Sequence, residues 1–318
     1  MGGLNINEEF IQALKAKIPK KTLLADRIAD VLCIEKETAY RRLRGDVQFS
    51  LREAGLIAKE LHISLDDILS KAMSVNYNVF HIRETSKTEK EDIWNMKAML
   101  NSLEKLKQQP HSEFGIMMAE MTFSRYLHYN LIPRFFIFKK IYHHGLQANP
   151  VRFDEIEGPE TGLKNKLNSL FQNITDTFYI WDRKIISNFV HDIKYFENIR
   201  QIKEEEVYQL KTEMHQLLNE LEQMAFRGEH SQTANKFELY ITNINLSVNC
   251  GYLWSENYNV NLYHTLLNYV AYTENEMNFE NIRNWIKSMK RSSTLVSGTG
   301  ERERIIFFDQ QRRIVDTL

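Results

Sequence analysis

Residues 22–45 read TLLADRIADVLCIEKETAYRRLRG, and this stretch decides how the beginning of the chain folds. Its first half has apolar residues at helical spacing with charged residues between them: Leu24, Ile28, Val31 and Leu32. This pattern predicts a short amphipathic helix. A second helix is expected over residues 36–44, because Gly45 readily takes the left-handed conformation that follows a helix. The stretch is therefore predicted to form two helices joined by a tight turn at residues 33–35.

The two expected helices need small and apolar side chains where they meet. Ala29 and Ala39 allow the two backbones to approach, and Ile34 would fill the gap between the helices. The residues predicted to pack this pair together are Ile28, Ala29, Leu32, Ile34, Ala39 and Leu43.

The second helix is dense in cationic and hydrogen-bonding side chains: Lys36, Thr38, Tyr40, Arg41, Arg42 and Arg44. Residues 1–75 contain 12 Lys and Arg against 11 Asp and Glu, so this concentration is local. Arginine can bond bidentately to guanine in the major groove, and lysine and threonine can reach phosphates. The alternative interpretation is a charged helix face that only meets solvent.

The same stretch resembles the helix-turn-helix of the Cro/C1 repressor family, the XRE type, through residues 28–34 and the run TAYRRLRG at 38–45. The resemblance continues through Ser50 and Glu53, which form a capping box, to Ser64 and Asp67, which open a last short helix. With an upstream helix over residues 8–17, it implies a five-helix DNA-binding bundle.

The resemblance also implies which side chains meet DNA. Those expected at base edges are Lys36, Glu37, Tyr40 and Arg41. Those expected at backbone phosphates are Thr22, Arg44 and Arg52. For Tyr40, packing in the core is an equal alternative, because tyrosines are commonly half-buried.

Two positions depart from the family pattern. Cys33 stands where the family usually has glycine, so a non-glycine residue must accept a positive φ or the turn must differ. Arg42 stands where a large apolar residue is usual, and Leu43 is expected to take over its packing.

The rest of the chain is expected to be mainly helical, because 12 Gly and 5 Pro in 318 residues are too few for a barrel or sandwich of many short strands. Residues 114–144 are interpreted as a buried helix bent at Pro133, and residues 163–227 as long helices. The last of these has a narrow apolar seam over residues 207–224, typical of a helix that packs against another helix.

Residues 236–265 have strand periodicity, with apolar and polar residues alternating, and Ser255-Glu256-Asn257 is a plausible hairpin turn. Apart from this segment the chain is expected to be helical, so the expected fold class is mainly α. A five-helix repressor-like domain covers residues 1–75, and a linker and connecting helix cover 76–110. A larger helical domain over 111–318 carries a small antiparallel β element near 236–265 and is expected to dimerise and to be a candidate for sensing a signal.

A glycine-rich segment near the end of the chain is a candidate anion site. Gly298, Gly300 and Arg302 combine backbone N–H groups with a positive charge at the start of a helix. A simple helix start capped by Thr299 is the alternative. The surrounding tail resembles the C-terminal region of Bacteroidetes-type regulators that carry the same N-terminal unit, and this resemblance implies no activity.

Composition limits the remaining possibilities. A net charge of −1 excludes binding to nucleic acid or membranes through bulk charge. Without a signal peptide or a long apolar run, the chain is expected in the cytoplasm, with Cys33 and Cys250 as buried free thiols. The adjacent His143 and His144 are a poor ligand pair, and catalytic motifs are absent, so no metal, no cofactor and no enzymatic activity are expected.

The sequence thus predicts a transcriptional regulator that binds double-stranded DNA as a homodimer, with an unidentified small-molecule or protein effector as a further candidate partner. The alternative is a protein-interaction scaffold in which the helix-turn-helix unit contacts protein. Joint exposure of Lys36, Arg41 and Arg44 would favour DNA. An unrecognised enzymatic domain would show as a deep pocket with converging polar groups.

Overall fold

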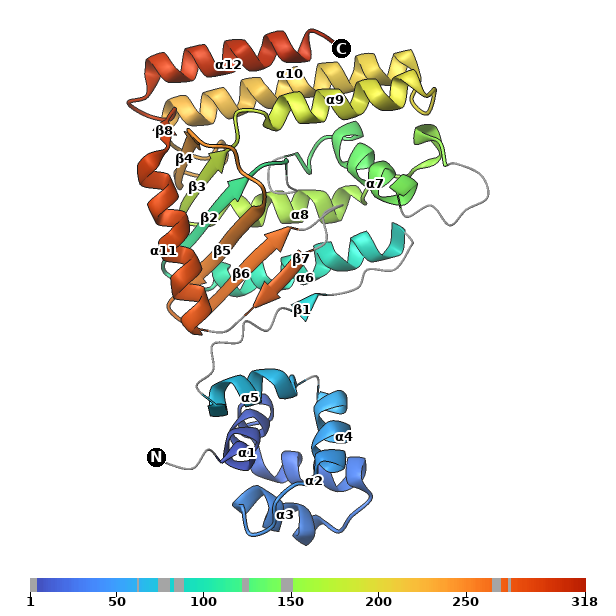
Figure 1. The fold of residues 1–318 in the computed structure, drawn as a ribbon, viewed down its shortest axis with the longest axis vertical. Coiled ribbons are helices and arrows are strands. Elements are labelled where there is room, and N and C mark those ends of the chain that lie inside the picture. Colours follow the sequence, from blue (N-terminus) through green and yellow to red (C-terminus); the bar gives the residue numbers. More distant parts are fainter. Residues whose placement is uncertain are drawn as a thin grey trace. The chain divides into compact units, whose positions relative to one another are not determined.

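The computed structural model describes residues 5–61, 63–73, 81–82, 89–121, 126–143, 151–264, 270–273 and 276–318. The chain divides into two compact units, residues 1–79 and residues 80–318. In its described part the first unit is helical, and the second contains an eight-stranded sheet with helices on both faces (Figure 1).

The described part of the first unit contains five helices: α1 (Ile6–Lys17), α2 (Lys21–Leu32), α3 (Lys36–Arg44), α4 (Leu51–Leu61) and α5 (Leu65–Met73). Its core is built from one face of each helix, with α2 and α3 meeting at Ile28, Ala39 and Leu43, all buried. Ala29, Leu32 and Ile34 are half-buried and pack against this core. All six residues predicted to pack the helix pair therefore contact the core.

The turn between α2 and α3 has the positive φ expected at Cys33. This residue is left-handed, with φ 52° and ψ 47°, and the N–H of Ile34 donates to the carbonyl of Ala29 at 3.0 Å. A left-handed non-glycine residue costs roughly 1–2 kcal/mol. The Cys33 side chain is exposed, contrary to the prediction that it is buried.

The second unit contains one mixed sheet in the order β1-β7-β6-β5-β2-β3-β4-β8. Its strands are β1 (His81–Ile82), β2 (Ser112–Met118), β3 (Asp176–Trp181), β4 (Lys236–Ile241), β5 (Asn249–Ser255), β6 (Tyr258–His264), β7 (Val270–Thr273) and β8 (Thr294–Leu295). The central strands β2, β3 and β4 run parallel, and every other neighbouring pair is antiparallel.

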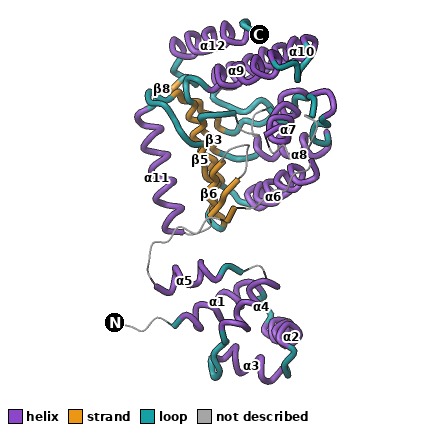
Figure 2. Tube along the Cα trace, turned by 45° about the vertical axis from the view of Figure 1, so that its right-hand side comes forward, coloured by secondary structure: helices purple, strands orange, loops and turns teal. Residues whose placement is uncertain are grey.

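Helices cover the two faces of the sheet unequally. The described helical segments are α6 (Glu89–Lys107), α7 (Leu131–His143), η1 (Phe153–Glu155), α8 (Thr161–Gln172), α9 (Ile185–Asn198), α10 (Glu204–Arg227), α11 (Glu276–Ser292) and α12 (Glu301–Val315). Figure 2 shows α11 on one side of the sheet and α6, α7 and α8 on the other. The larger core lies on the side of α6 to α10, and a smaller core lies under α11.

The prediction of a mainly α fold with a small antiparallel element is wrong, because an eight-stranded mixed sheet organises the second unit. The strands β2 and β3 are buried on both faces, so their segments EFGIMM and DTFYIW show almost no polar alternation. A short apolar run of this kind cannot be distinguished from a buried helix by periodicity.

The element boundaries change accordingly. Residues 112–118 form a strand. Among the described residues of the expected long helix, only 131–143 are helical, with Pro133 in the first turn where a missing N–H is tolerated. The strand β3 interrupts the expected helices over 163–227. The predicted hairpin is confirmed for β5 and β6, but β4 pairs in parallel with β3.

The apolar seam of α10 packs within its own chain. Its members are all buried: Val207, Leu210, Met214, Leu217, Leu221 and Met224. Contacts from α7, α9, α12 and β4 cover this helix. Cys250 is buried, as predicted, and burial raises the pKa of its thiol to about 12. Among the described residues, we find no helix with both the length and the apolar character needed to cross a membrane.

Candidate nucleic-acid interface

The outward face of α3 is the strongest candidate site in the first unit. Ala39 and Leu43 are buried on its inner side, at 0% and 3% exposure. Because successive helical residues are about 100° apart, Arg41 lies opposite this pair, with Glu37 and Arg44 beside it. These three side chains are exposed, and so is Lys36. By the same geometry Lys36, in the first turn, lies nearer the buried side. The outward face of α3 therefore presents two arginines and one carboxylate, with Lys36 exposed at its edge.

Ion pairs hold part of this face in place. Lys36 pairs with Asp26 of α2, and this bond raises the pKa of the lysine. Arg44 lies 3.3 Å from Glu37 and 2.9 Å from Asp46. Arg41 has no ion pair within the described residues. Its guanidinium is therefore the cation on this face that is least committed to the protein.

Tyr40 lies partly in the core and partly at the surface. It is half-buried and packs against the core of the first unit, while the Nζ of Lys21 lies 5.9 Å from its ring centroid. Its remaining exposed surface adjoins Lys36, which is one turn earlier on α3.

The start of α2 adds a second group of donors. Thr22 is exposed in its first turn, next to Lys20 and Lys21, and no side chain caps this end of the helix. Uncapped N–H groups and lysines together form a favourable environment for a phosphate. The two lysines were not among the predicted phosphate contacts, although the run PKKT at 19–22 could have indicated them. Arg52 is exposed in the first turn of α4 and has no ion pair in the described part of the chain.

An ion pair replaces the expected apolar contact at Arg42. Its guanidinium donates to Glu53 at 2.6 Å, and the two side chains are only 14% and 22% exposed. The other carboxylate oxygen of Glu53 accepts from the N–H of Ser50 at 2.8 Å, which completes the predicted capping box. Burial alone would raise the pKa of Glu53, but the bonds from Ser50 and Arg42 lower it. The pair connects α3 to α4, and Leu43 supplies the buried packing, as expected.

In the glycine-rich segment before α12, the backbone N–H groups of both predicted glycines donate to carbonyl oxygens of the protein. The N–H of Gly298 donates to the carbonyl of Ala225 at 2.8 Å, and that of Gly300 to Ser297 at 3.1 Å. Arg302 is exposed on the first turn of α12, whereas the buried Arg304 donates to carbonyl oxygens of the segment. Gly300 itself is the N-cap residue of α12, so Thr299 does not hold that position.

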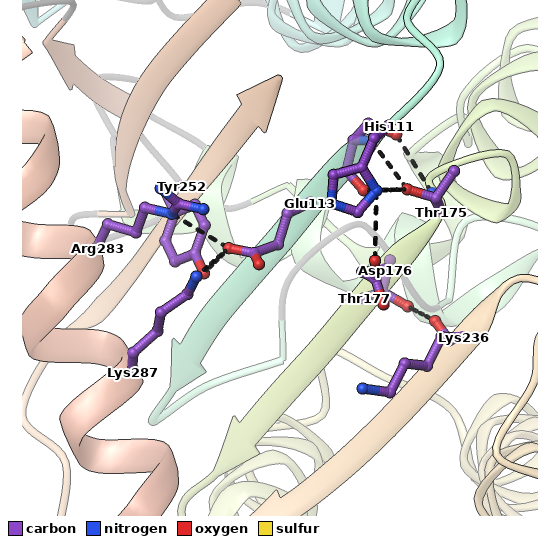
Figure 3. Close-up of polar contacts among 10 residues, drawn as sticks. His111, Glu113, Thr175, Asp176, Thr177, Lys236, Tyr252, Arg283 and Lys287 are labelled. Carbon is purple, nitrogen blue, oxygen red and sulfur yellow. Dashed lines mark hydrogen bonds and ion pairs between the residues drawn. The ribbon is translucent and has the colours of Figure 1, made fainter. Parts of the chain in front are cut away.

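A charged cluster in the second unit lies between the sheet and α11 (Figure 3). One oxygen of Glu113 on β2 accepts from Tyr252 at 2.5 Å, and from Lys287 and Arg283 of α11 at 2.9 and 3.2 Å. Burial alone would raise the pKa of Glu113, but these donors outweigh it and lower the pKa. A carboxylate held in this way is suited to anchoring α11 and poorly suited to accepting a proton.

Beside it, at the amino ends of β2 and β3, the Nδ1 of His111 lies 3.0 Å from the hydroxyl of Thr175 and 3.5 Å from Asp176 (Figure 3). His111 is exposed. Thr175 is already engaged by the backbone of Ser112, at 2.8 Å from its N–H and 2.6 Å from its carbonyl. These hydrogen bonds connect the amino ends of β2 and β3.

His143 packs against Phe196 and Tyr142, and His144 lies outside the described residues. Over the described ranges, no group of three or more His, Cys, Asp or Glu side chains could hold a metal ion. The chain matches no known family model, no curated protein and no solved structure.

Proposed function

We propose that the protein is a transcriptional regulator that binds specific sequences in double-stranded DNA through α3. The observation that carries this proposal is the joint exposure of Lys36, Arg41 and Arg44 on one short helix, with the two arginines opposite its buried side. A scaffold that used this unit for protein contact would not require such a face.

Recognition would divide between base edges and phosphates. Arg41, opposite the buried side of α3, is the side chain best suited to a bidentate contact with guanine. Glu37 can accept from a cytosine amino group and keeps Arg44 beside it through their 3.3 Å ion pair. Thr22 with its neighbouring lysines and Arg52 on α4 would hold phosphates on either side.

We further propose that two copies act together. One reader of this size buries limited surface on DNA, whereas two readers spaced about one helical turn, roughly 34 Å, would engage a palindrome and add their binding energies. The second unit is the part of the chain that would bring two copies together.

The test begins with selection of bound sequences from random duplex DNA by the full chain, followed by fluorescence-anisotropy titrations. Arg41→Ala is expected to weaken binding to the selected duplex by about 1–3 kcal/mol and to change binding to random duplex little. Arg52→Ala is expected to weaken both equally and to reduce the salt slope by about 1. Arg313→Ala, an exposed arginine on α12, makes the same charge change and is the control. Equal affinity of the wild type for selected and random duplex would refute the proposal.

A further inference from the structure

A groove of about 320 Å³ lies between α8 and α10 on the surface of the second unit. Three apolar residues of α10 lie at its floor, where they are 1%, 1% and 7% exposed: Leu217, Leu221 and Met224. Its volume is at the lower end of the range of known small-molecule sites. The groove therefore has room for a small ligand above an apolar base.

Two matched rows of polar side chains form the walls. The row on α8 consists of Asn165, Asn168 and Gln172, and the row on α10 consists of Glu220, Gln223 and Arg227. Both rows have the spacing i, i+3, i+7, which keeps their members on one side of a helix. The two helices precede the neighbouring parallel strands β3 and β4, so the rows run in the same direction.

One end of the groove is closed by a loop that is hydrogen-bonded to α8. The buried side chain of Gln172 accepts from the N–H of Gln232 at 2.9 Å, and its backbone carbonyl accepts from Thr233 at 2.7 Å. Ser231 and Gln232 close the groove beside Arg227. Hydrogen bonds within the protein thus hold the wall at this end.

The two ends of the groove differ in charge. Glu220 is at one end, with its side chain 51% exposed and one oxygen 2.9 Å from the Nε2 of His128. Arg227 is at the other end, exposed and without an ion pair among the described residues. They are seven positions apart on α10, which corresponds to about 10.5 Å along the helix. Between these charges the walls carry only amides.

We propose that this groove binds a short peptide with free ends, with its ammonium group at Glu220 and its carboxylate at Arg227. An extended chain spans about 3.3–3.6 Å per residue, so a distance of 10.5 Å corresponds to about three residues. Side-chain amides carry a donor and an acceptor each, which matches the alternating C=O and N–H groups of a peptide backbone. Arginine binds a carboxylate with two parallel hydrogen bonds, which fixes the orientation of the peptide.

The inference does not depend on DNA binding, and its test uses the full chain without DNA. Binding of tri-alanine is measured by isothermal titration calorimetry, beside N-acetylated tri-alanine, C-amidated tri-alanine and a neutral trisaccharide of similar length. Tri-alanine is chosen because small side chains fit the volume of the groove. We expect tri-alanine to bind, each blocked peptide to bind at least about tenfold more weakly, and the trisaccharide to show no binding.

Variants locate the site. In Arg227→Gln the free and the C-amidated peptides should bind with equal affinity, while the effect of N-acetylation remains. In Glu220→Gln the effect of N-acetylation should disappear instead. Arg313→Gln on α12 should behave like the wild type. The proposal is overturned if tri-alanine does not bind, if the trisaccharide binds in its place, or if Arg227→Gln keeps the preference for a free carboxylate.

Discussion

The anchoring of α11 gives a quantitative prediction for Glu113→Gln. The substitution keeps the size of the side chain and removes its negative charge. It leaves Arg283 and Lys287, whose side chains are 16% and 33% exposed, without their shared carboxylate. Arg283 keeps a weaker partner in Glu280, at 3.5 Å.

The size of the effect follows from this burial. Breaking a fully buried ion pair costs about 3–5 kcal/mol, whereas an exposed pair contributes about 0–1 kcal/mol. The Glu113 side chain is 16% exposed, which places the cluster between these limits. We expect Glu113→Gln to lower the free energy of unfolding of the second unit by about 2 kcal/mol at pH 7.

The effect should depend on pH with a definite sign. The pKa of Glu113 is lower in the folded protein than in the unfolded chain, where a glutamate titrates near about 4.3. Its contribution is therefore complete above that value and is lost as the pH falls through the lower folded pKa. The difference between wild type and variant should narrow below about pH 4.

Urea unfolding followed by tryptophan fluorescence measures this difference. All 4 tryptophans follow residue 90, so the signal comes from the second unit. Glu120→Gln is the control, since Glu120 is exposed directly after β2 and has no ion pair in the described part of the chain; we expect a change within about 0.5 kcal/mol. The reasoning fails if Glu113→Gln is as stable as the wild type at pH 7, or if a difference persists unchanged at low pH.

Three further substitutions test other features. Cys33→Gly removes the left-handed strain, and the higher conformational entropy of the unfolded chain offsets part of this gain. We expect a net stabilisation of about 0.5 kcal/mol, measured as slower hydrogen exchange in the α2–α3 turn. Faster exchange would contradict this. Gly300→Ala would place its Cβ 2.2 Å from a backbone carbonyl oxygen and should lower the free energy of unfolding in urea by about 2 kcal/mol. In the control Gly162→Ala, the nearest atom to the new Cβ is 3.5 Å away, so no loss of stability is expected. Glu53→Ala removes part of the capping box of α4 and the ion-pair partner of Arg42. The first unit should lose about 2 kcal/mol of stability, measured by thermal unfolding followed by circular dichroism. An unchanged transition would rule out a stabilising role for Glu53.

The first unit was predictable because its signals are local. The apolar spacing around Ile28, the glycine after α3 and the Ser50 capping box each specify structure within a few residues. The partner of Arg42 was not predictable from such signals, because Glu53 lies 11 residues away on another helix. The sequence showed that Arg42 stands where an apolar residue is usual, but not which contact the arginine makes.

The central part of the sheet was not predicted, and the reason is physical. The hairpin of β5 and β6 was found through its turn residues, while the strands β2 and β3 lack alternation because both their faces are buried. The cluster joins Glu113 to Arg283, 170 positions away in sequence, and to Lys287 beyond it. Contacts at such separation leave no periodic trace in the chain. The two rows that line the α8–α10 groove do have helical spacing, but the spacing within each row does not show that the rows face each other.

The position of α11 in the chain also bears on synthesis. This helix follows β7, near one edge of the sheet, and leads into β8, which pairs with β4 at the other edge. While the chain emerges from the ribosome, β2, β3 and β4 can assemble only as an open layer with one apolar face uncovered until residues 276–295 have been made. The first unit, whose described helices end at Met73, has no such dependence and can fold early. The nascent second unit would therefore be the part that requires chaperone protection.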